Sequence, residues 1–392
     1  MATFFSNPVK IHEGRGSLED IAHLLGDRPA ILVTTHGMVR RGVVKQIEKL
    51  CCTKIQRIVT KVTPNTTFET IRNCYAEVCQ CDFNVVIGLG GGSALDTAKA
   101  IAFLSGCVMD IDELIIYLRN GKKKGMGVKA KPLIAIPTTS GTGSEVTSWG
   151  SIWDQQTGKK YSLMDESLYP EWALLDANLT DSLPYSVTLS TALDALSHAM
   201  EAIWNKNANP VSDGLAFFAI SLSVSTLGDR FQRKYKKREV RDKLQQASLL
   251  AGLAFSNTQT ALAHSISYPL TAKFGIPHGF ASSLTLAEVL RFNYPHDKKR
   301  IGAILHAMRA DTVQEGVSQL YRIFWETGVP EYLKIFIKDS AGVFSIEPDL
   351  ITSSRAKNNV VVVSQKEATK ILRSALVQLL PKEGKHVSRS KL

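Results

Sequence analysis

The chain has 392 residues, of which 44% are hydrophobic, and a formal net charge of +11 at pH 7. This length favours two or more domains, and the composition excludes a disordered protein. The apolar runs at 84–92 and 131–137 are too short to cross a bilayer, and the N-terminus lacks the apolar core of a secretory signal. We therefore expect a cytoplasmic protein without a membrane partner.

The positive charge raises the question of nucleic acid. Basic residues gather at 232–243 and 381–392, without a helix-turn-helix, zinc-finger or RNA-binding motif beside them. We expect no nucleic-acid partner, since an anionic substrate or cofactor is equally compatible with this charge. The six cysteines all lie in the first third of the chain and lack paired C-x-x-C units, which indicates reduced thiols.

The first half alternates apolar runs with helical patterns. Strands that end in turns or loops are expected in "AILVTTHG" (30–37), "CDFNVVIGLGGG" (81–92) and "KPLIAIPTTSGTGSE" (131–145). Helices are expected at 43–50 and at 93–106, the second with Ser93 in the capping position. Such alternation predicts an α/β domain with a parallel sheet and helices on both faces. Ligands of such domains collect at the carboxyl ends of the strands.

After about residue 184 the pattern becomes helical, with few strand-forming runs. We therefore predict an α/β dinucleotide-binding domain over residues 1–184 and an all-helical domain over residues 185–392. No internal repeat stands out.

Two loops at the ends of predicted strands suit a phosphate-bearing cofactor. The stretch "GLGGGSALD" (88–96) offers backbone N–H groups at the start of a helix, although it departs from G-x-G-x-x-G at Ser93. The stretch "PTTSGTGSE" (137–145) offers hydroxyl groups. A structural turn explains the glycine loop about as well as binding does, and a Ser/Thr/Gly loop is usually only an exposed turn. The occurrence of both on neighbouring strands favours binding.

The helical half carries candidate metal ligands. Asp194 and His198 are four residues apart, on one face of a predicted helix and among apolar neighbours. In isolation this spacing would indicate an exposed ion pair or a cap, but in apolar surroundings both groups need a metal or a partner. His264, in a helical pattern, and His278, on an expected turn after Pro277, would complete a set of three histidines and a carboxylate, which suits Fe(II) or Zn(II).

The chain resembles the iron-dependent (group III) alcohol dehydrogenases in five segments that keep the family's order. These segments are "GGGSALDTAK", "PTTSGTGSEVT", "DALSHAMEA", "AHSISYPL" and "GIPHG". The resemblance implies an N-terminal dinucleotide-binding domain, a C-terminal helical domain and an active site in the cleft between them. It also implies NAD(P)-linked hydride transfer to a metal-bound carbonyl, and a homodimer or larger homo-oligomer.

The resemblance also assigns residues to the site. It gives the metal to Asp194, His198, His264 and His278, and the cofactor pyrophosphate to Gly91, Gly92 and Ser93. It places Thr138, Thr139, Thr142 and Lys160 around the rest of the cofactor, and Phe255 near the substrate.

Two positions depart from the family's pattern. Thr35 stands where the family often has an Asp that repels the 2′-phosphate of NADP, so we expect NADP(H) to be accepted, with Arg40 or Arg41 as a positive partner, and NAD(H) not excluded. Tyr268 stands where many members carry a further histidine. It is either a catalytic residue or a packing residue in a reshaped pocket.

The substrate hypothesis rests on two segments. "SHAMEAIWNKNANP" and "AHSISYPLTAKFGIPHG" look like the branch that reduces phosphonoacetaldehyde to 2-hydroxyethylphosphonate, and Lys160 or Lys206 could bind the phosphonate. The alternatives are a generic primary alcohol or diol dehydrogenase and a dehydroquinate synthase-like lyase. The chain ends in Ser390, Lys391 and Leu392, a peroxisomal address in a eukaryote and a chance tripeptide in a bacterium.

Overall fold

The computed structural model describes residues 4–107, 109–120, 129–228, 230–338, 340–351 and 354–380. The terminal tripeptide of the peroxisomal hypothesis lies outside these residues. The chain divides into an α/β unit, Asn7–Thr139 with Gly143–Asp181, and a helical unit, which contains residues 4–6, Ser140–Thr142 and the chain from Ser182 onward.

Two short segments before residue 184 thus belong to the helical unit, unlike the predicted division. Both are fixed by contacts there. The N–H of Ser6 donates to Asn257 Oδ1 over 2.9 Å, and Gly141 packs directly on the backbone of Thr191.

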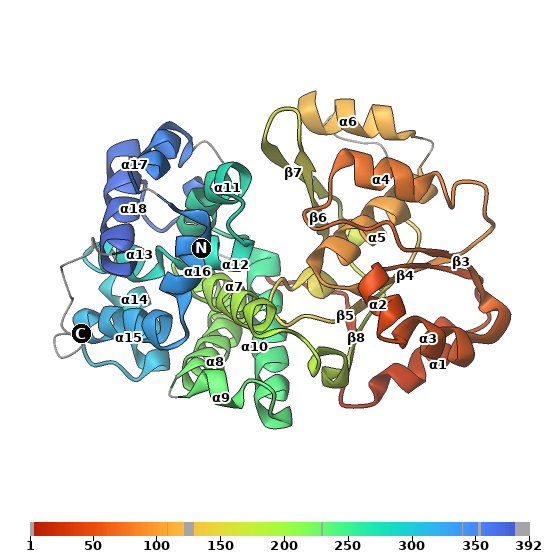
Figure 1. Cartoon of the computed structure of the whole chain (residues 1–392), viewed down its shortest axis with the longest axis horizontal. Coiled ribbons are helices and arrows are strands. Elements are labelled where there is room, and N and C mark those ends of the chain that lie inside the picture. Colours follow the sequence, from red (N-terminus) through yellow and green to blue (C-terminus); the bar gives the residue numbers. More distant parts are fainter. Residues whose placement is uncertain are drawn as a thin grey trace. The chain divides into compact units, whose positions relative to one another are not determined.

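The α/β unit is built on a six-stranded sheet in which every pairing is parallel (Figure 1). Its strands are β1 (Lys10–Glu13), β2 (Ala30–Val33), β3 (Ile55–Val59), β4 (Val85–Gly90), β5 (Leu133–Pro137) and β8 (Trp172–Leu175), in the order β1-β8-β5-β4-β2-β3. A separate antiparallel hairpin consists of β6 (Trp149–Asp154) and β7 (Lys159–Met164).

The three strands expected from apolar runs are neighbours in the middle of this sheet. Their side chains alternate between two cores, because successive residues of a strand face opposite sides. Ile31 and Val86 lie in one core, whereas Leu32 and Ile87 lie in the other. Burial on both faces explains why these strands read as continuous apolar runs.

Helices cover both faces of the sheet. Residues of α1 (Ile21–Leu25), α2 (His36–Arg40) and α3 (Val43–Cys51) pack in the core of one face. Residues of α4 (Phe68–Tyr75), α5 (Gly92–Gly106) and α6 (Ile111–Asn120) pack in the other. Helix α5 begins at Gly92 with Gly91 as its N-cap, so Ser93 is not the capping residue. All six cysteines are free thiols.

The described elements of the helical unit are all helices. They are α7 (Tyr185–Ile203), α8 (Pro210–Leu227), α9 (Phe231–Lys234), α10 (Arg238–Thr258), α11 (Leu262–Phe274), α12 (His278–Ser283), α13 (Leu286–Asn293), α14 (Lys298–Met308), α15 (Val313–Glu326), α16 (Val329–Phe336), α17 (Ser340–Val343) and α18 (Gln365–Leu379), with short 3-10 turns between α17 and α18. Helix α7 packs against α8, α10 and α12, and every residue from Ala192 to Ile203 is buried. The fold class predicted from the sequence is thus confirmed.

Helix α8 is the one described helix that is long and apolar enough, by length and composition, to cross a membrane. The search for apolar runs missed it because Asp213 and several serines interrupt the run. One side of α8 packs on α7, α10 and α14, while Phe218 on the other side is exposed. A surface helix of a globular unit has this one-sided burial.

Candidate metal and nucleotide sites

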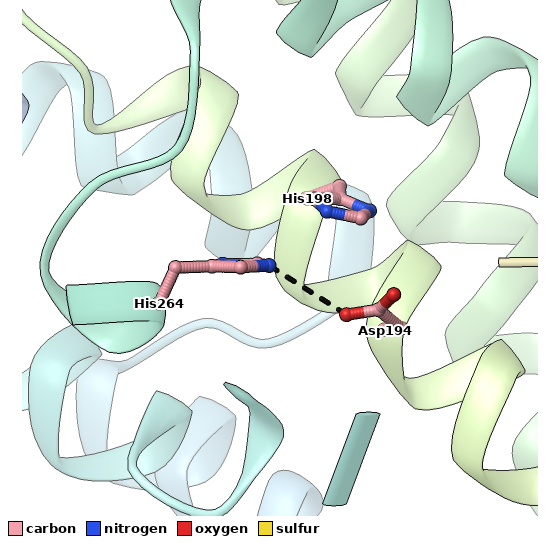
Figure 2. A group of neighbouring side chains, drawn as sticks. All are labelled: Asp194, His198 and His264. Carbon is pink, nitrogen blue, oxygen red and sulfur yellow. Dashed lines mark ion pairs between the residues drawn. The ribbon is translucent and has the colours of Figure 1, made fainter. Parts of the chain in front are cut away.

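Asp194 and His198 project from the same side of α7, one turn apart (Figure 2). Their side chains are almost fully buried, with relative exposures of 3% and 5%. Helix α7 brings them inside because most of their neighbours on the helix are alanine or leucine, and α7 packs on α8, α10 and α12. A carboxylate in such surroundings is stabilised only by a positive or hydrogen-bonding partner.

His264 supplies that partner from a second helix. It is the third residue of α11, and its Nε2 lies 3.6 Å from Oδ1 of Asp194 (Figure 2). The rings of His198 and His264 stack with centroids 4.6 Å apart. Asp194, His198 and His264 each offer one ligand atom, and these atoms lie within 4.8 Å of one another.

The surroundings of the two imidazoles determine which nitrogen faces the group. Nδ1 of His198 lies 3.2 Å from the carbonyl oxygen of Gly141, and Nδ1 of His264 lies 2.7 Å from Oε2 of Glu201. A carbonyl and an ionised carboxylate only accept hydrogen bonds, so each Nδ1 carries the proton. Each Nε2 is then left as the metal-binding nitrogen, which is the arrangement typical of histidine ligands.

The group fits a divalent cation. Nε2 of His264 is buried and has no hydrogen-bond partner among the described residues, although it faces the Asp194 carboxylate. Two imidazole nitrogens and one carboxylate oxygen form a donor set suited to Fe(II) or Zn(II). A cation among them would provide the positive charge that the buried carboxylate needs.

The charges of the metal-free group agree with this fit. Burial opposes ionisation of Asp194, but the three nearby histidines hold its pKa well below the ordinary value. Burial lowers the pKa of His198 to about 4, which leaves a neutral imidazole at neutral pH. Burial also acts to lower the pKa of His264, but Glu201 and Asp194 outweigh it and raise that pKa to about 10. Without a cation, the carboxylates of Glu201 and Asp194 thus favour the positively charged form of His264.

His278 lies at the edge of the group. It begins α12 instead of lying on a turn, and its Nε2 is 3.9 Å from Oδ1 of Asp194. Its side chain is 25% exposed, against 2% for His264. A Cβ added to the following Gly279 would lie 1.8 Å from the carbonyl oxygen of Ser190, so only glycine lets α12 approach α7 this closely.

Two further predicted residues contact these histidines. Phe255, on α10, stacks on His198 with ring centroids 4.0 Å apart. Because its ring has no group that transfers a proton, Phe255 could act only by packing, and its place near the substrate stays a prediction. The ring of Tyr268, on α11, lies nearly parallel to that of His278, with centroids 6.2 Å apart.

The predicted cofactor residues of the α/β unit follow three adjacent strands. Gly91, Gly92 and Ser93 follow β4, and Thr138 and Thr139 follow β5. A Cβ added to Gly91 would meet the Thr139 side chain at 3.2 Å, so the two loops touch. Thr35 follows β2 and is the N-cap of α2. The chain runs from β2 to β3 on one side and then crosses back to β4 on the other side of β2. Ligands of parallel sheets bind where the strand order reverses in this way.

Lys160 and Thr142 come from other segments, although the charge of Lys160 acts on Asp96 of α5. Lys160 belongs to the β6–β7 hairpin, where its Nζ is 5.8 Å from the centroid of Trp153. Thr142 belongs to the helical unit. Their assignment to the cofactor stays a prediction.

Sequence reasoning missed two buried residues beside these sites. Glu201 binds His264, and Lys99, on α5, donates from Nζ to Ser144, Thr147 and Trp149 at the end of the hydroxyl-rich loop. Glu201 follows His198 by three residues on the helical face that carries Asp194, and this spacing could have identified it as a neighbour of the metal site.

Comparison with known families decides the identity. Residues 8–177 match the model of the iron-containing alcohol dehydrogenases, and residues 188–376 match the C-terminal model of the same family. The chain belongs to the iron-containing alcohol dehydrogenase family. The predicted enzyme class, an oxidoreductase acting on CH–OH groups, is thereby confirmed. Members of this family use iron and NAD(P).

Relatives within the iron-containing alcohol dehydrogenase family act on different small molecules. The 1-propanol dehydrogenase PduQ of Citrobacter freundii is 34% identical over 74% of this chain and 73% of its own. A sulfoacetaldehyde reductase of Bilophila wadsworthia is 34% identical over 77% of this chain and 78% of its own. The crystal structure of a sulfoacetaldehyde reductase from Bifidobacterium kashiwanohense in complex with NAD+ is similar with a TM-score of 0.87, at 28% identity over 96% of this chain and 99% of that one.

Proposed function

We propose that this protein is a metal-dependent reductase of small aldehydes that carry a compact anionic group, with phosphonoacetaldehyde as the candidate substrate and 2-hydroxyethylphosphonate as the product. The observation that carries the metal-dependent reaction is the buried set of Asp194, His198 and His264, whose ligand atoms lie within 4.8 Å of one another. Iron or zinc is the proposed metal, with His278 as the fourth ligand.

Different residues of this chain would bind the metal, orient its histidine ligands and bind the cofactor. Asp194 and the Nε2 atoms of His198 and His264 would hold the metal, which when bound acts as a Lewis acid on the carbonyl group. The Gly141 carbonyl and the Glu201 carboxylate keep the protons on the opposite nitrogens. In the α/β unit, backbone N–H groups at Gly91–Ser93 and the start of α5 suit the cofactor pyrophosphate. The protein thus positions the nicotinamide cofactor and a polarised carbonyl for hydride transfer.

Two observations support an anionic substrate. Sulfoacetaldehyde reductases occur among the relatives in sequence and in structure, and a sulfonate resembles a phosphonate in size and in its oxygen acceptors. The formal charge of +11 also favours attraction of anions. The alternative is an uncharged primary alcohol or diol, which the 1-propanol dehydrogenase relative favours.

We propose that NADPH is accepted in addition to NADH. Thr35, at the end of β2, carries no charge that would repel a 2′-phosphate. Arg41 already donates to the carbonyl oxygen of Leu179, whereas Arg40 is exposed at the end of α2. Arg40 is therefore the better candidate for the positive partner.

Steady-state kinetics of metal-reconstituted protein test these proposals together. The panel contains phosphonoacetaldehyde, sulfoacetaldehyde, propanal and lactaldehyde, each with NADPH and NADH. We expect the highest kcat/KM with the two anionic aldehydes; equal or higher values with propanal would favour the uncharged alternative. Net consumption of the reduced cofactor separates a reductase from a lyase, and strict use of NADH would contradict the role proposed for Thr35.

Tyr268→His tests whether the tyrosine beside His278 selects the substrate. We expect the ratio of kcat/KM for phosphonoacetaldehyde to that for lactaldehyde to fall, because the family's common residue would replace a bulkier phenol. An unchanged ratio would assign Tyr268 to packing. A homodimer or larger assembly and a cytoplasmic location are further proposals, which light scattering and cell fractionation test.

A further inference from the structure

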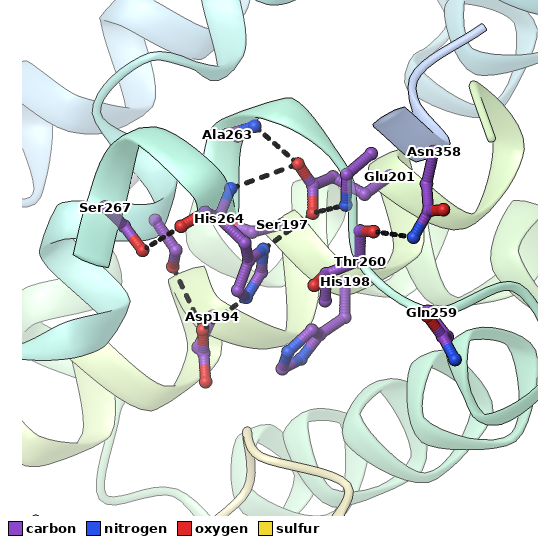
Figure 3. A network of polar contacts seen from close by, with 12 residues as sticks. Asp194, Ser197, His198, Glu201, Gln259, Thr260, Ala263, His264, Ser267 and Asn358 are labelled. Carbon is purple, nitrogen blue, oxygen red and sulfur yellow. Dashed lines mark hydrogen bonds and ion pairs between the residues drawn. The ribbon is translucent and has the colours of Figure 1, made fainter. Parts of the chain in front are cut away.

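Glu201 is a fully buried carboxylate at the centre of a polar network in the helical unit (Figure 3). Its Oε2 accepts hydrogen bonds from the N–H of Ala261 and from Nδ1 of His264, both over 2.7 Å. Its Oε1 accepts from the N–H of Ala263 over 2.6 Å and from the N–H of His264 over 3.2 Å. Both oxygens are thus occupied by N–H donors from the start of α11.

Three of these donors are the first backbone N–H groups of α11. Ala261 is the N-cap, and Ala263 and His264 are the second and third residues of the helix. Such N–H groups have no acceptor within their own helix, and a negative charge at this end is favourable. Ala261 has no side-chain cap of its own. Glu201, reaching over from α7, serves as the cap of the helix that carries His264.

The turn before α11 depends on side chains from other segments. Gln259 has a φ of +64°, a conformation uncommon for residues other than glycine. Asn205 donates to the carbonyl oxygen of Gln259 over 3.0 Å, and Asn358 donates to that of Thr260 over 2.9 Å (Figure 3). The start of α11 is therefore held in place from outside, with Glu201 making four of the contacts.

We propose that Glu201 is a positioning residue for the metal site, which sets both the place of His264 and the nitrogen it presents. One carboxylate binds the backbone of His264 and its Nδ1, so the helix and the ring are oriented together. As a result, Nε2 points at Asp194. This inference rests on the proposed metal site and goes beyond it by adding a residue that never contacts the metal.

Glu201→Gln is the most informative substitution because it keeps size and shape. Each carboxylate oxygen of Glu201 accepts two N–H donors. Whichever way the glutamine amide is turned, its NH₂ group therefore meets two N–H donors and no acceptor. Facing Nδ1 of His264, it forces the proton onto Nε2 and removes that ligand atom. Facing the backbone, it removes the cap. We expect the Kd for Zn(II), measured by chelator competition, to rise by about 10–100-fold.

Glu288→Gln is the matched control. Glu288 is also a buried carboxylate of the helical unit, but its partners are Arg291 and Tyr321 and not a candidate ligand. It reports the loss of stability that any buried glutamate-to-glutamine change causes. We expect Glu288→Gln to bind Zn(II) and Co(II) as the parent protein does, and Glu201→Gln to lose affinity and to shift the visible absorption bands of Co(II).

The outcomes separate this inference from the proposed function. If the parent protein binds no divalent metal, the proposed metal site fails. If the parent and Glu201→Gln bind Zn(II) with equal affinity and give the same Co(II) spectrum, the positioning role is overturned while the metal site stands. A loss of melting temperature alone, equal to that of Glu288→Gln, likewise assigns Glu201 to structure only.

A second measurement does not depend on the folding of any variant. In zinc-loaded parent protein labelled with 15N-histidine, long-range 1H–15N spectra report which imidazole nitrogen carries the proton. We expect His264 to carry it on Nδ1 with a strongly downfield proton, as for an N–H that donates to a carboxylate. Protonation at Nε2 would overturn the proposal.

Discussion

The ring of Phe255 lies almost parallel to that of His198, with centroids 4.0 Å apart and planes inclined by 6°. Phe255 comes from α10 and His198 from α7, and both side chains are buried. The contact therefore packs α10 against α7 at the position of a candidate metal ligand, His198. It restricts how the imidazole of His198 can turn, in addition to the hydrogen bond from its Nδ1 to Gly141.

Phe255→Ala should lower both stability and metal affinity. Removing a buried phenyl ring costs about 3–5 kcal/mol of unfolding free energy, and the cavity frees one face of His198. Phe255→Leu fills much of that cavity and should cost less. Denaturant unfolding of metal-free protein and Zn(II) titration measure the two effects. Unchanged Zn(II) affinity in folded Phe255→Ala would show that Phe255 does not orient the ligand.

Gly279→Ala should weaken metal binding by displacing His278. The added Cβ would lie 1.8 Å from the carbonyl oxygen of Ser190, so α12 must move away from α7. Gly302→Ala on α14 is the control, because its Cβ meets nothing within 4 Å and alanine is the better helix former. We expect a higher Kd for Zn(II) in the first variant only. Equal affinity in both would remove His278 from the ligand set.

Lys99→Met should destabilise the α/β unit strongly. Nζ of Lys99 donates to the carbonyl oxygens of Ser144, Thr147 and Trp149 and to the Thr147 hydroxyl, at 2.6 to 3.0 Å. Methionine fills the space but removes the ammonium donor from these buried acceptors, at a cost of about 3–5 kcal/mol. Lys131→Met, which removes one bond to the Phe83 carbonyl oxygen, should cost much less in the same denaturant titration.

Glu145→Gln should raise the unfolding free energy, relative to that of the parent protein, as pH rises. Burial raises the pKa of Glu145 to about 7, despite the opposing charge of Lys99. The native state therefore holds a proton that the unfolded chain releases at lower pH, so its stability is highest at acid pH and falls as pH rises towards 7. Glutamine is neutral throughout and avoids this loss.

Unfolding free energies at about pH 5 and about pH 8 test the effect, which we expect to be about 2 kcal/mol in favour of the variant at the higher pH. Glu19→Gln, at an exposed position of the same unit, corrects for general effects of pH. A difference between Glu145→Gln and the parent that does not change with pH would contradict the buried neutral acid.

The sequence predicted those parts of the fold that carry strong local patterns. Strands β2, β4 and β5 are apolar throughout because both of their faces are buried. β1 is an edge strand with mostly exposed side chains, and it offered no such run. In the hairpin, β6 alternates buried and partly exposed residues over a short length and β7 is mostly partly exposed, so the hairpin was missed.

For the candidate site too, only features with a local sequence pattern could be predicted. Asp194 and His198 could be paired because their spacing places them on one helical face. The four bonds of Glu201 could not be predicted, since three of its donors are backbone groups, which have no residue type to recognise. His278 was expected on a turn after Pro277, but it is the first residue of α12, with Pro277 as the N-cap. Proline is common at helix starts, so the same residue signals either a turn or a helix.

The position of β1 has a consequence for the order of assembly. Residues Lys10–Glu13 pair with Trp172–Leu175, and with no other strand in the described part of the chain. At about 5–20 residues per second, synthesis would deliver β8 roughly ten seconds or more after β1. During that interval the first strand has no partner. Fragments released before residue 172 should therefore leave their N-terminal segment open to proteases, whereas fragments that extend beyond residue 175 should protect it.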